Sequence, residues 1–390
     1  GRELPADAGA TDDTVPLDSL EGITVQEMDW APHLDGVESD PDPLARFIPA
    51  DQYALFFPTF EDFVKSADAA DAEGTPILGL VESRAEDART KERYERQLCL
   101  RTDALSRALG PKLIRSMAVT GGDPYLRTGS DVAILFEPVD AAVLKELLLA
   151  RRLAAAKASG IPFDVVETEI GIAAPCYGLV SADRSVCSYL LSLQGCLIVS
   201  NSLPLLGRIH RMYLRKDESV AALDEYRFFR SRYRRGDPDE TAFLVLTDGA
   251  IRKWCGPKWR IAASRRVRAA AVLGELTARH RDAILEARPP DPLGARFGVV
   301  DLGIVRATPQ GVQSSTYNTA AFLTPIAELE FSKVTEQEAG LYRSWRGGYQ
   351  SNRSQHCDPI AVRRTRIRTS LGPVSGPSTV SSQGRAPASP

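Results

Sequence analysis

The chain has 390 residues, of which 43% are hydrophobic and 25% are charged, and its formal net charge is −3. This composition is typical of a soluble globular protein with one large domain or two ordinary ones. No apolar run approaches the roughly 20 residues of a membrane-spanning helix, so the composition excludes a transmembrane segment in the chain shown. The net charge favours no class of partner.

The first 45 residues carry twelve acidic side chains against a single base, Arg2, and are rich in Pro and Gly. Apolar residues are isolated in this stretch, so it cannot bury much surface. We expect 1–45 to be an acidic extended arm that packs near 23–30 and is otherwise mobile.

Four stretches share one pattern, in which a short apolar strand leads through a polar hinge into an apolar-periodic helix. The clearest is 196–210, where an apolar run meets Ser200, Asn201 and Ser202 as helix-cap candidates, with Pro204 in the first helical turn. The same strand–cap–helix unit recurs at 54–72, 132–157 and 242–255. The units are irregularly spaced, so they do not form a solenoid.

The remaining patterns, in chain order, predict a long polar helix at 82–109 ended by Gly110 and Pro111, and a strand at 113–119 joined by a turn to the strand at 132–136. An antiparallel meander is expected over 163–199. Helices are expected at 222–233, 260–285 and 336–345, and late strands at 297–305 and 311–321.

These elements predict an α+β fold, with antiparallel-rich mixed sheet(s) and helices packed against them. We expect a globular region at 46–358, either with a single core or as two lobes of about 46–160 and 161–358. From Arg363 onward the chain consists mostly of Ser, Gly, Pro and Arg, has no acidic residue and has few apolar residues. We expect 359–390 to be a disordered basic tail, with a shifted reading frame as the alternative.

No motif in the sequence indicates a specific chemistry. Gly121, Gly122 and Gly129 lie between two predicted strands and lack the Lys-Ser/Thr of a phosphate-binding loop, so a hairpin turn is favoured. Ser200 and Ser202 lie at a strand-to-helix turn but lack the flanking glycines of a hydrolase elbow. Helix capping explains both serines.

Metal-ligand spacing is also absent. His33, His210, His280 and His356 are far apart, and the six cysteines contain no C-x-x-C pair. Small buried hydrophobes are the default interpretation of such cysteines, and one disulfide among Cys176, Cys187 and Cys196 is the alternative. We therefore predict no catalytic, cofactor-binding or metal-binding residues, and no cofactor.

Two basic clusters raise the question of a polyanion site. They are Arg208–Lys216 with Arg227–Arg235, and Arg260–Arg268 with Arg279 and Arg281. Acidic residues such as Asp217, Glu218, Asp224 and Glu225 are interleaved with the first cluster, so solvated helix faces are the favoured interpretation. No nucleic-acid partner is expected.

Short phrases in about 46–250 resemble a bacterial family of extracytoplasmic proteins that is classed as a domain of unknown function. The phrases are Ile48–Phe56, Asp131–Asp140, Cys196–Ser202, Glu218–Val220 with Tyr226–Phe229, and the strand Ala242–Leu246. The resemblance implies a location in the bacterial envelope, periplasm or cell surface, and it implies no known activity. Members usually begin with a signal or anchor, which this chain does not show.

The leading functional hypothesis is a non-catalytic, envelope-associated interaction or scaffold protein with an unknown protein or envelope partner. One alternative is an enzyme whose site is assembled from residues distant in sequence, which would show as a polar pocket with perturbed pKa values. The other is a polyanion or nucleic-acid binder that uses the basic helices.

Overall fold

The computed structural model describes residues 13–24, 28–36, 38–69, 90–123, 126, 129–170, 174–215, 219–288, 296–297, 300–308, 311–353, 359–366 and 380–381. The described part has an α+β fold, which confirms the expected class. It divides into two compact units, one from residues up to 26 and 254–356, the other from 27–253 and beyond 357. This division differs from the expected lobes at 46–160 and 161–358.

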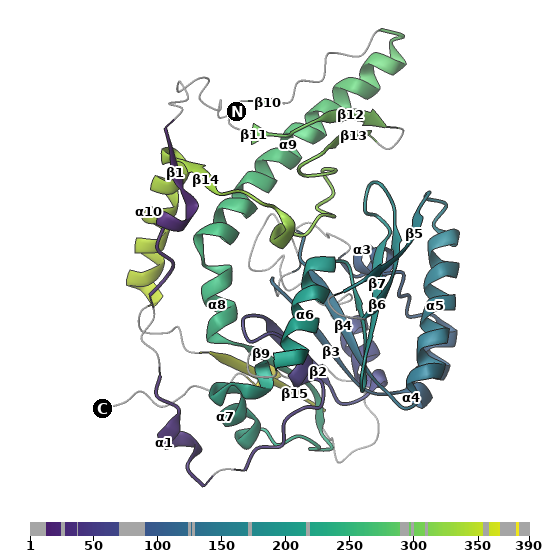
Figure 1. Cartoon of the computed structure of the whole chain (residues 1–390), viewed down its shortest axis with the longest axis vertical. Coiled ribbons are helices and arrows are strands. Elements are labelled where there is room, and N and C mark those ends of the chain that lie inside the picture. The colour runs from purple at the N-terminus through teal and green to yellow at the C-terminus, as the bar shows by residue number, and fades with distance from the viewer. Residues whose placement is uncertain are drawn as a thin grey trace. The chain divides into compact units, whose positions relative to one another are not determined.

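The main sheet belongs to the second unit and has ten strands among the described residues, all paired antiparallel (Figure 1). Their order is β16-β15-β9-β2-β3-β4-β8-β7-β6-β5. In chain order the strands are β2 (Tyr53–Phe57), β3 (Ile114–Gly121), β4 (Val132–Pro138), β5 (Asp164–Glu169), β6 (Pro175–Val180), β7 (Cys187–Leu193), β8 (Cys196–Ser200), β9 (Glu240–Leu246), β15 (Ile360–Thr365) and β16 (Val380–Ser381). The sequential neighbours β5, β6, β7 and β8 form the expected meander.

The helices of this unit follow the predicted strand–cap–helix pattern. They are 60–69 after β2, α5 (Ala141–Ala158) after β4, α6 (Leu203–Arg215) after β8 and α8 (Asp248–Trp254) after β9. The caps are local: Asp140 accepts hydrogen bonds from the N–H groups of Ala142 and Val143, and Thr247 accepts one from that of Ala250. The helix predicted at 222–233 is α7 (Asp224–Arg232). The same unit also contains the short 3-10 helices η2 (Ala45–Phe47) and η3 (Val220–Ala222).

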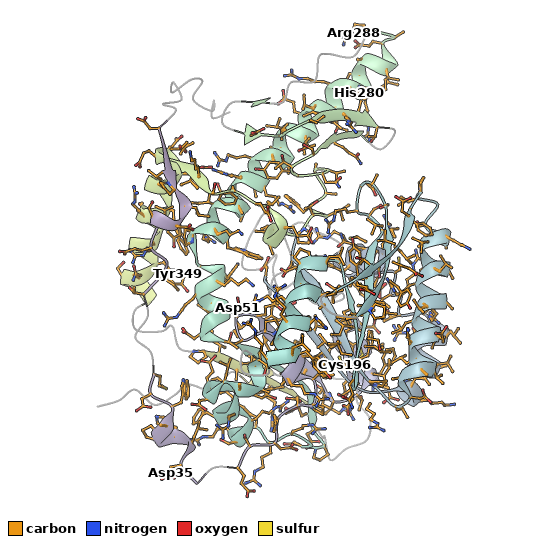
Figure 2. All side chains as sticks on the ribbon, in the orientation of Figure 1. Asp35, Asp51, Cys196, His280, Arg288 and Tyr349 are labelled. Carbon is orange, nitrogen blue, oxygen red and sulfur yellow. The ribbon has the colours of Figure 1, made fainter. Side chains whose placement is uncertain are left out.

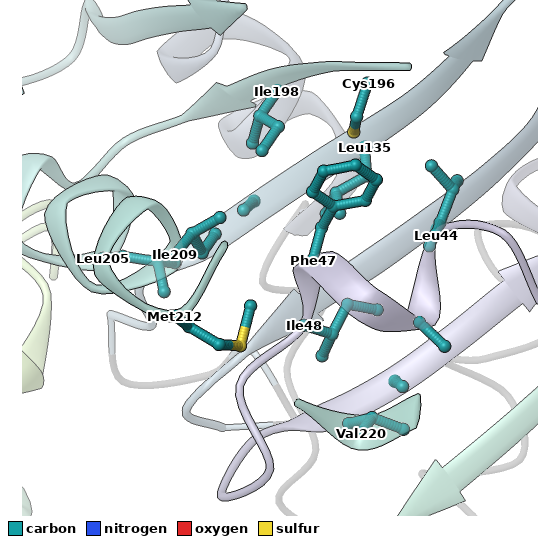
Figure 3. Close-up of a cluster of buried hydrophobic side chains, with 14 of the residues drawn as sticks. Leu44, Phe47, Ile48, Leu135, Cys196, Ile198, Leu205, Ile209, Met212 and Val220 are labelled. Atoms are coloured by element: carbon teal, nitrogen blue, oxygen red, sulfur yellow. The ribbon is translucent and has the colours of Figure 1, made fainter. Parts of the chain in front are cut away.

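The position of β8 between two buried clusters explains why its sequence is a continuous apolar run. Leu197 and Val199 belong to one buried cluster and Cys196 and Ile198 to another, and all four side chains are fully buried. A strand covered on both faces needs no polar alternation. Figure 3 shows the cluster that β8 shares with η2, α6 and η3, with Phe47 among the labelled side chains.

The predicted single helix 82–109 is wrong where the structure describes it. α3 (Thr90–Gln97) ends before Cys99, whose φ of 56° is left-handed backbone that a helix cannot continue through. A second helix, α4 (Ala104–Leu113), starts after the N-cap Asp103, so Gly110 and Pro111 lie inside a helix instead of ending one. The start of the predicted helix, 82–89, lies outside the described residues.

The prediction that 359–390 is a disordered tail is wrong for the described residues 360–365, which form the strand β15. β15 pairs with β9 from Ile360↔Leu246 to Thr365↔Glu240, so this segment supplies a strand of the main sheet. The Arg363 guanidinium also lies 2.9 Å from a carboxylate oxygen of Asp237. Composition alone did not show that Arg363 and Arg364 belong to a paired strand.

The first unit contains β1 (Thr14–Pro16), η1 (Leu17–Ser19), the long helix α9 (Pro257–Leu285), η4 (Ile326–Glu328), β14 (Lys333–Thr335) and α10 (Glu336–Arg353). Short strands complete it: β10 (Arg296–Phe297), β11 (Val300–Asp301), β12 (Val305–Thr308) and β13 (Gly311–Ser314). β1 pairs with β14, and Leu17 and Leu20 are buried against α9 and α10 side chains. The described part of the expected arm is therefore folded, and it also includes α1 (Ala31–Leu34) in the second unit. Among the described residues no helix combines the length and apolarity needed to cross a bilayer.

Candidate functional site

One end of the main sheet gathers polar residues from four strands. The register pairs Tyr53 with Gly121, Gly121 with Val132, and Ala133 with Ser200. The residues just before β2 and β4 and just after β3 and β8 therefore meet at the same end. We call this group the polar end; it consists of Gln52, Thr120, Asp123, Ser130, Asp131 and Asn201, all buried.

Asp131 is held at the polar end by two donors. Its Oδ1 accepts a hydrogen bond of 3.0 Å from the backbone N–H of Gly122, and its Oδ2 accepts one of 3.3 Å from Nε2 of Gln52. The Gln52 carbonyl oxygen in turn accepts from the hydroxyl of Thr120 at 3.1 Å. A buried carboxylate needs such donors to offset its lost hydration, and these tie β2, β3 and β4 together.

Asn201 joins three segments that are distant in sequence. Its Oδ1 accepts from the N–H of Val132 at 2.9 Å, and its Nδ2 donates to the side-chain oxygen of Gln97 at 3.1 Å and to the backbone oxygen of Ser130 at 3.0 Å. Its backbone oxygen accepts from Arg184 at 2.9 Å. Asn201 is therefore a cross-link between β8, β4 and α3.

The expectation that Ser200, Asn201 and Ser202 all cap the central helix needs correction. Only the Ser202 hydroxyl accepts from the first turn of α6, from the N–H of Leu205 at 3.4 Å. The Ser200 hydroxyl donates to the backbone oxygen of Val132 at 2.8 Å. Both serines are fully buried, which fits structural roles and not that of an exposed nucleophile.

Two tyrosines line the polar end. Burial first, and then the charges of Tyr94, Asp131 and Asp123, raise the pKa of Tyr53 well above its usual value. Burial also raises the pKa of Tyr94, whose hydroxyl accepts from the N–H of Ser130 at 3.1 Å. Both phenols are therefore neutral at physiological pH.

The glycines that could have formed a phosphate cradle instead adjoin this network. β3 and β4 pair antiparallel on either side of them, as a hairpin requires. A Cβ on Gly121 would lie 2.2 Å from the backbone oxygen of Asp131, so the close approach of the two strands explains this glycine. Residues 124, 125, 127 and 128 of the connection lie outside the described residues.

The cysteines behave as buried thiols. Cys99, Cys176, Cys187, Cys196 and Cys255, the cysteines among the described residues, are buried and form no disulfide, so the alternative disulfide among the three meander cysteines is not formed. Burial raises the pKa of Cys99 and of Cys176 to about 11, although the nearby Arg152 guanidinium lowers it. They stay protonated at neutral pH and are poor nucleophiles.

Arg152 is itself a buried cation, and its contacts are with hydroxyl and backbone oxygens. Its Nε donates to the Ser188 hydroxyl at 2.8 Å, and Nη2 donates to the backbone oxygens of Tyr177 and Ser188. Burial lowers the pKa of Arg152 to about 10. These bonds fix α5 on the meander.

A second charged group lies around the start of α8. Asp51, labelled in Figure 2, pairs with Arg208 of α6 and lies 3.4 Å from the ammonium of Lys253. The buried carboxylate of Glu225 accepts a hydrogen bond from the N–H of Asp248, and burial raises its pKa to about 7. Sequence reasoning missed this group because four separate segments supply it.

The histidines and the basic clusters considered above can be compared with these contacts. His33, His210 and His280 belong to separate elements and His356 is not described, and no cluster of potential metal ligands occurs among the described residues. On α9, Arg265 and Arg268 both pair with Glu338, at 2.6 and 2.9 Å. The prediction that no nucleic acid binds stays a prediction.

The strand β5 is the most exposed strand of the main sheet among those whose burial the structure describes. It is last in the strand order, and in the described part of the chain it pairs only with β6. All of its residues are exposed or half-buried, and Val165 is 65% exposed. Among the residues that the structure describes, no strand pairs with the other side of its backbone.

Comparison with protein-family models, with curated protein sequences and with solved structures finds no match. The resemblance to an extracytoplasmic bacterial family therefore stays a prediction.

Proposed function

We propose that this chain is a non-catalytic interaction protein that binds a partner by adding an extended segment of that partner to its main sheet at β5. The observation that carries the proposal is the open edge of β5. An edge strand presents unpaired N–H and C=O groups, and strand addition is a common way in which proteins capture peptides.

The regularity of β5 supports this role. Its six residues pair with β6 from Asp164↔Val180 to Glu169↔Pro175 without a register shift. Proteins commonly blunt an edge with a bulge, a proline or a very short strand. β5 has none of these, although three of its six side chains are charged, so its free side offers a continuous ladder of about 20 Å, at about 3.3 Å per residue.

The contacts at the polar end support a non-catalytic role. The side-chain atoms of Asp131 are hydrogen-bonded to Gly122 and Gln52, and those of Asn201 to Val132 and Gln97. These bonds fix the ends of the strands. General acid–base catalysis needs a group that can reach a substrate proton. Here the polar end stabilises the sheet whose far edge is β5.

An envelope location belongs to the same proposal and rests on the resemblance of 46–250 to extracytoplasmic proteins. Fractionation of bacterial cells that express the full-length natural gene tests it. Recovery of the protein in the envelope or periplasmic fraction is expected, and recovery in the cytosolic fraction alone would contradict it.

Proline substitution tests strand addition directly. Along an antiparallel strand the N–H groups point alternately to the paired neighbour and to the free side. One of Val165→Pro and Val166→Pro therefore keeps the β5–β6 ladder and blocks the edge, and its melting temperature identifies it. Extended peptides selected by phage display on the full chain should bind this variant at least about tenfold more weakly, a loss of about 1.4 kcal/mol.

Hydrogen exchange provides a second measurement that does not depend on a folded variant. In the complex, the amides of β5 that face the free side should become protected from exchange. Selected peptides that bind both proline variants as tightly as the parent, with no protection of β5, would refute the proposal.

A further inference from the structure

We infer that the segment captured by β5 is a basic extended peptide with Lys or Arg at every second position, and this inference rests on the proposed strand addition. β5 carries Asp164, Glu167 and Glu169 and no basic residue, and all three acids are exposed. Among the described residues no ion pair within 4.0 Å involves any of them. The strand therefore presents Glu167 and Glu169 on one face and Asp164 on the other, without an ion-pair partner among the described residues.

The pleat of the strand sets the spacing of the partner's charges. Side chains two residues apart lie on the same face, so Val165, Glu167 and Glu169 share one face and Val166 and Thr168 lie on the other. An added strand places its side chains about 4.5–5.5 Å from those directly opposite. Two bases separated by one residue would meet Glu167 and Glu169 together, and small or β-branched residues between them suit the other face.

The neighbour on the paired side does not neutralise these acids. Glu167 is opposite Tyr177 and Glu169 is opposite Pro175 on β6. Lys145 of α5 lies over the Tyr177 ring, 5.0 Å from its centroid, and forms no ion pair with Glu167 within 4.0 Å. Opposite charges directly across strands stabilise a sheet by roughly 0.2–1 kcal/mol a pair, so the free side is where the compensation is available.

A second copy of this chain fits the edge poorly. Self-pairing centred on Glu167 would place the two copies of that carboxylate opposite each other. Centring on Thr168 would place Glu167 opposite Glu169 twice. Like charges directly opposite are destabilising, so the acids favour a basic partner and oppose these two registers of self-pairing.

Four synthetic nonapeptides with blocked ends test the inference on the full chain by fluorescence anisotropy. They are alternating Lys–Thr, alternating Gln–Thr, alternating Glu–Thr, and a block peptide with the Lys–Thr composition. We expect Lys–Thr to bind about 10- to 100-fold more tightly than Glu–Thr, and the block peptide to bind weakly because its charges do not share one face.

A charge exchange provides the matched comparison. Glu167→Lys with Glu169→Lys should reverse the preference between the Lys–Thr and Glu–Thr peptides. The control Glu61→Lys with Glu92→Lys makes the same change in net charge at exposed residues of other elements and should preserve the parent's preference. A reversal in both variants would show a long-range charge effect and overturn the inference.

The remaining outcomes separate the two proposals. In one outcome, the Gln–Thr and Lys–Thr peptides bind equally well to the parent and not to the edge-blocked proline variant. This result would support strand addition at β5 but overturn the inference that the captured segment is basic. Sedimentation analysis could instead show that the parent chain forms a dimer and that the Glu167→Lys, Glu169→Lys variant alters this association. That result would identify a second copy of the chain as the occupant of the edge and would also overturn the basic partner. No binding by any alternating peptide would refute both proposals.

Discussion

The carboxylate of Glu225 accepts a hydrogen bond of 3.0 Å from the backbone N–H of Asp248, the first residue of α8. This contact joins the first turn of α7 to the start of α8 across 23 residues of sequence. Glu225 is only 7% exposed, and burial raises its pKa to about 7. The Asp248 carboxylate also raises it, while the hydrogen bond and Arg252 lower it.

The raised pKa of Glu225 predicts a pH-dependent stability. The folded state binds this proton more tightly than the unfolded state, whose Glu has a pKa near 4.5. The stability that the folded state gains from protonated Glu225 is therefore fully present below about pH 4.5 and is lost as the pH rises through about 7. Glu225→Gln should become more stable than the parent as the pH rises from 5 to 8, by up to about 3 kcal/mol.

Urea unfolding at several pH values measures this difference, with Glu146→Gln on the exposed side of α5 as the control. The control should shift stability equally at all pH values. A Glu225→Gln effect that does not change with pH would contradict the assigned environment of this carboxylate.

A second prediction concerns Arg230, whose side chain is fully buried. Its Nε and Nη2 donate to the two oxygens of Asp42 at 2.7 and 2.9 Å, and its Nη1 lies 3.0 Å from Glu240. Asp42→Ala would leave a buried cation with one carboxylate fewer, so we expect a loss of roughly 3–5 kcal/mol in the free energy of unfolding.

The exposed pair of Arg227 and Asp224, at 3.1 Å on the same helix, is the matched comparison. Arg227→Ala should cost less than about 1 kcal/mol because water screens this pair. Equal urea midpoints for the two variants would show that the Arg230 network does not hold residue 42 in the folded state.

The parts of the fold that could be predicted depend on local chemistry. The units that start at β2, β4, β8 and β9 were predicted because a cap residue and an apolar period are adjacent in sequence. The helix of the predicted unit 132–157, for example, begins at Ala141, directly after its N-cap Asp140.

The rest depends on contacts between distant residues. β15 was assigned to a tail because the chain from Arg363 onward is mostly Ser, Gly, Pro and Arg with few apolar residues, and only its pairing with β9 shows that it is a strand. Asn201 was interpreted as a cap because nothing local reveals Gln97, which is 104 residues away. The acidic edge of β5 could be found only after the strand order was known.

The corrected role of Asn201 gives a third prediction. Asn201→Ala removes three side-chain hydrogen bonds and leaves the N–H of Val132 and the side chain of Gln97 with a lost partner. Each buried group left unsatisfied costs about 1–3 kcal/mol, so we expect a total loss of several kcal/mol. Ser202→Ala removes one cap and should cost about 1 kcal/mol. Urea midpoints for the two variants in the opposite order would restore the capping interpretation.

The last prediction compares two glycines. A methyl group on Gly121 would lie 2.2 Å from the backbone oxygen of Asp131. That oxygen cannot move away easily, because the Asp131 carboxylate is bound to Gly122 and Gln52. Gly121→Ala should therefore separate β3 from β4 locally and destabilise the protein by roughly 1–3 kcal/mol.

Gly340 lies inside α10, and a methyl group there would have no heavy atom within 4 Å. Gly340→Ala should stabilise the protein by up to about 1 kcal/mol, because alanine favours the helix. Thermal unfolding of both variants by circular dichroism gives the sign of each change. A Gly121→Ala protein as stable as the parent would mean that the backbone at the polar end can shift at little cost. It would also mean that Asp131 does not fix the distance between β3 and β4 at Gly121.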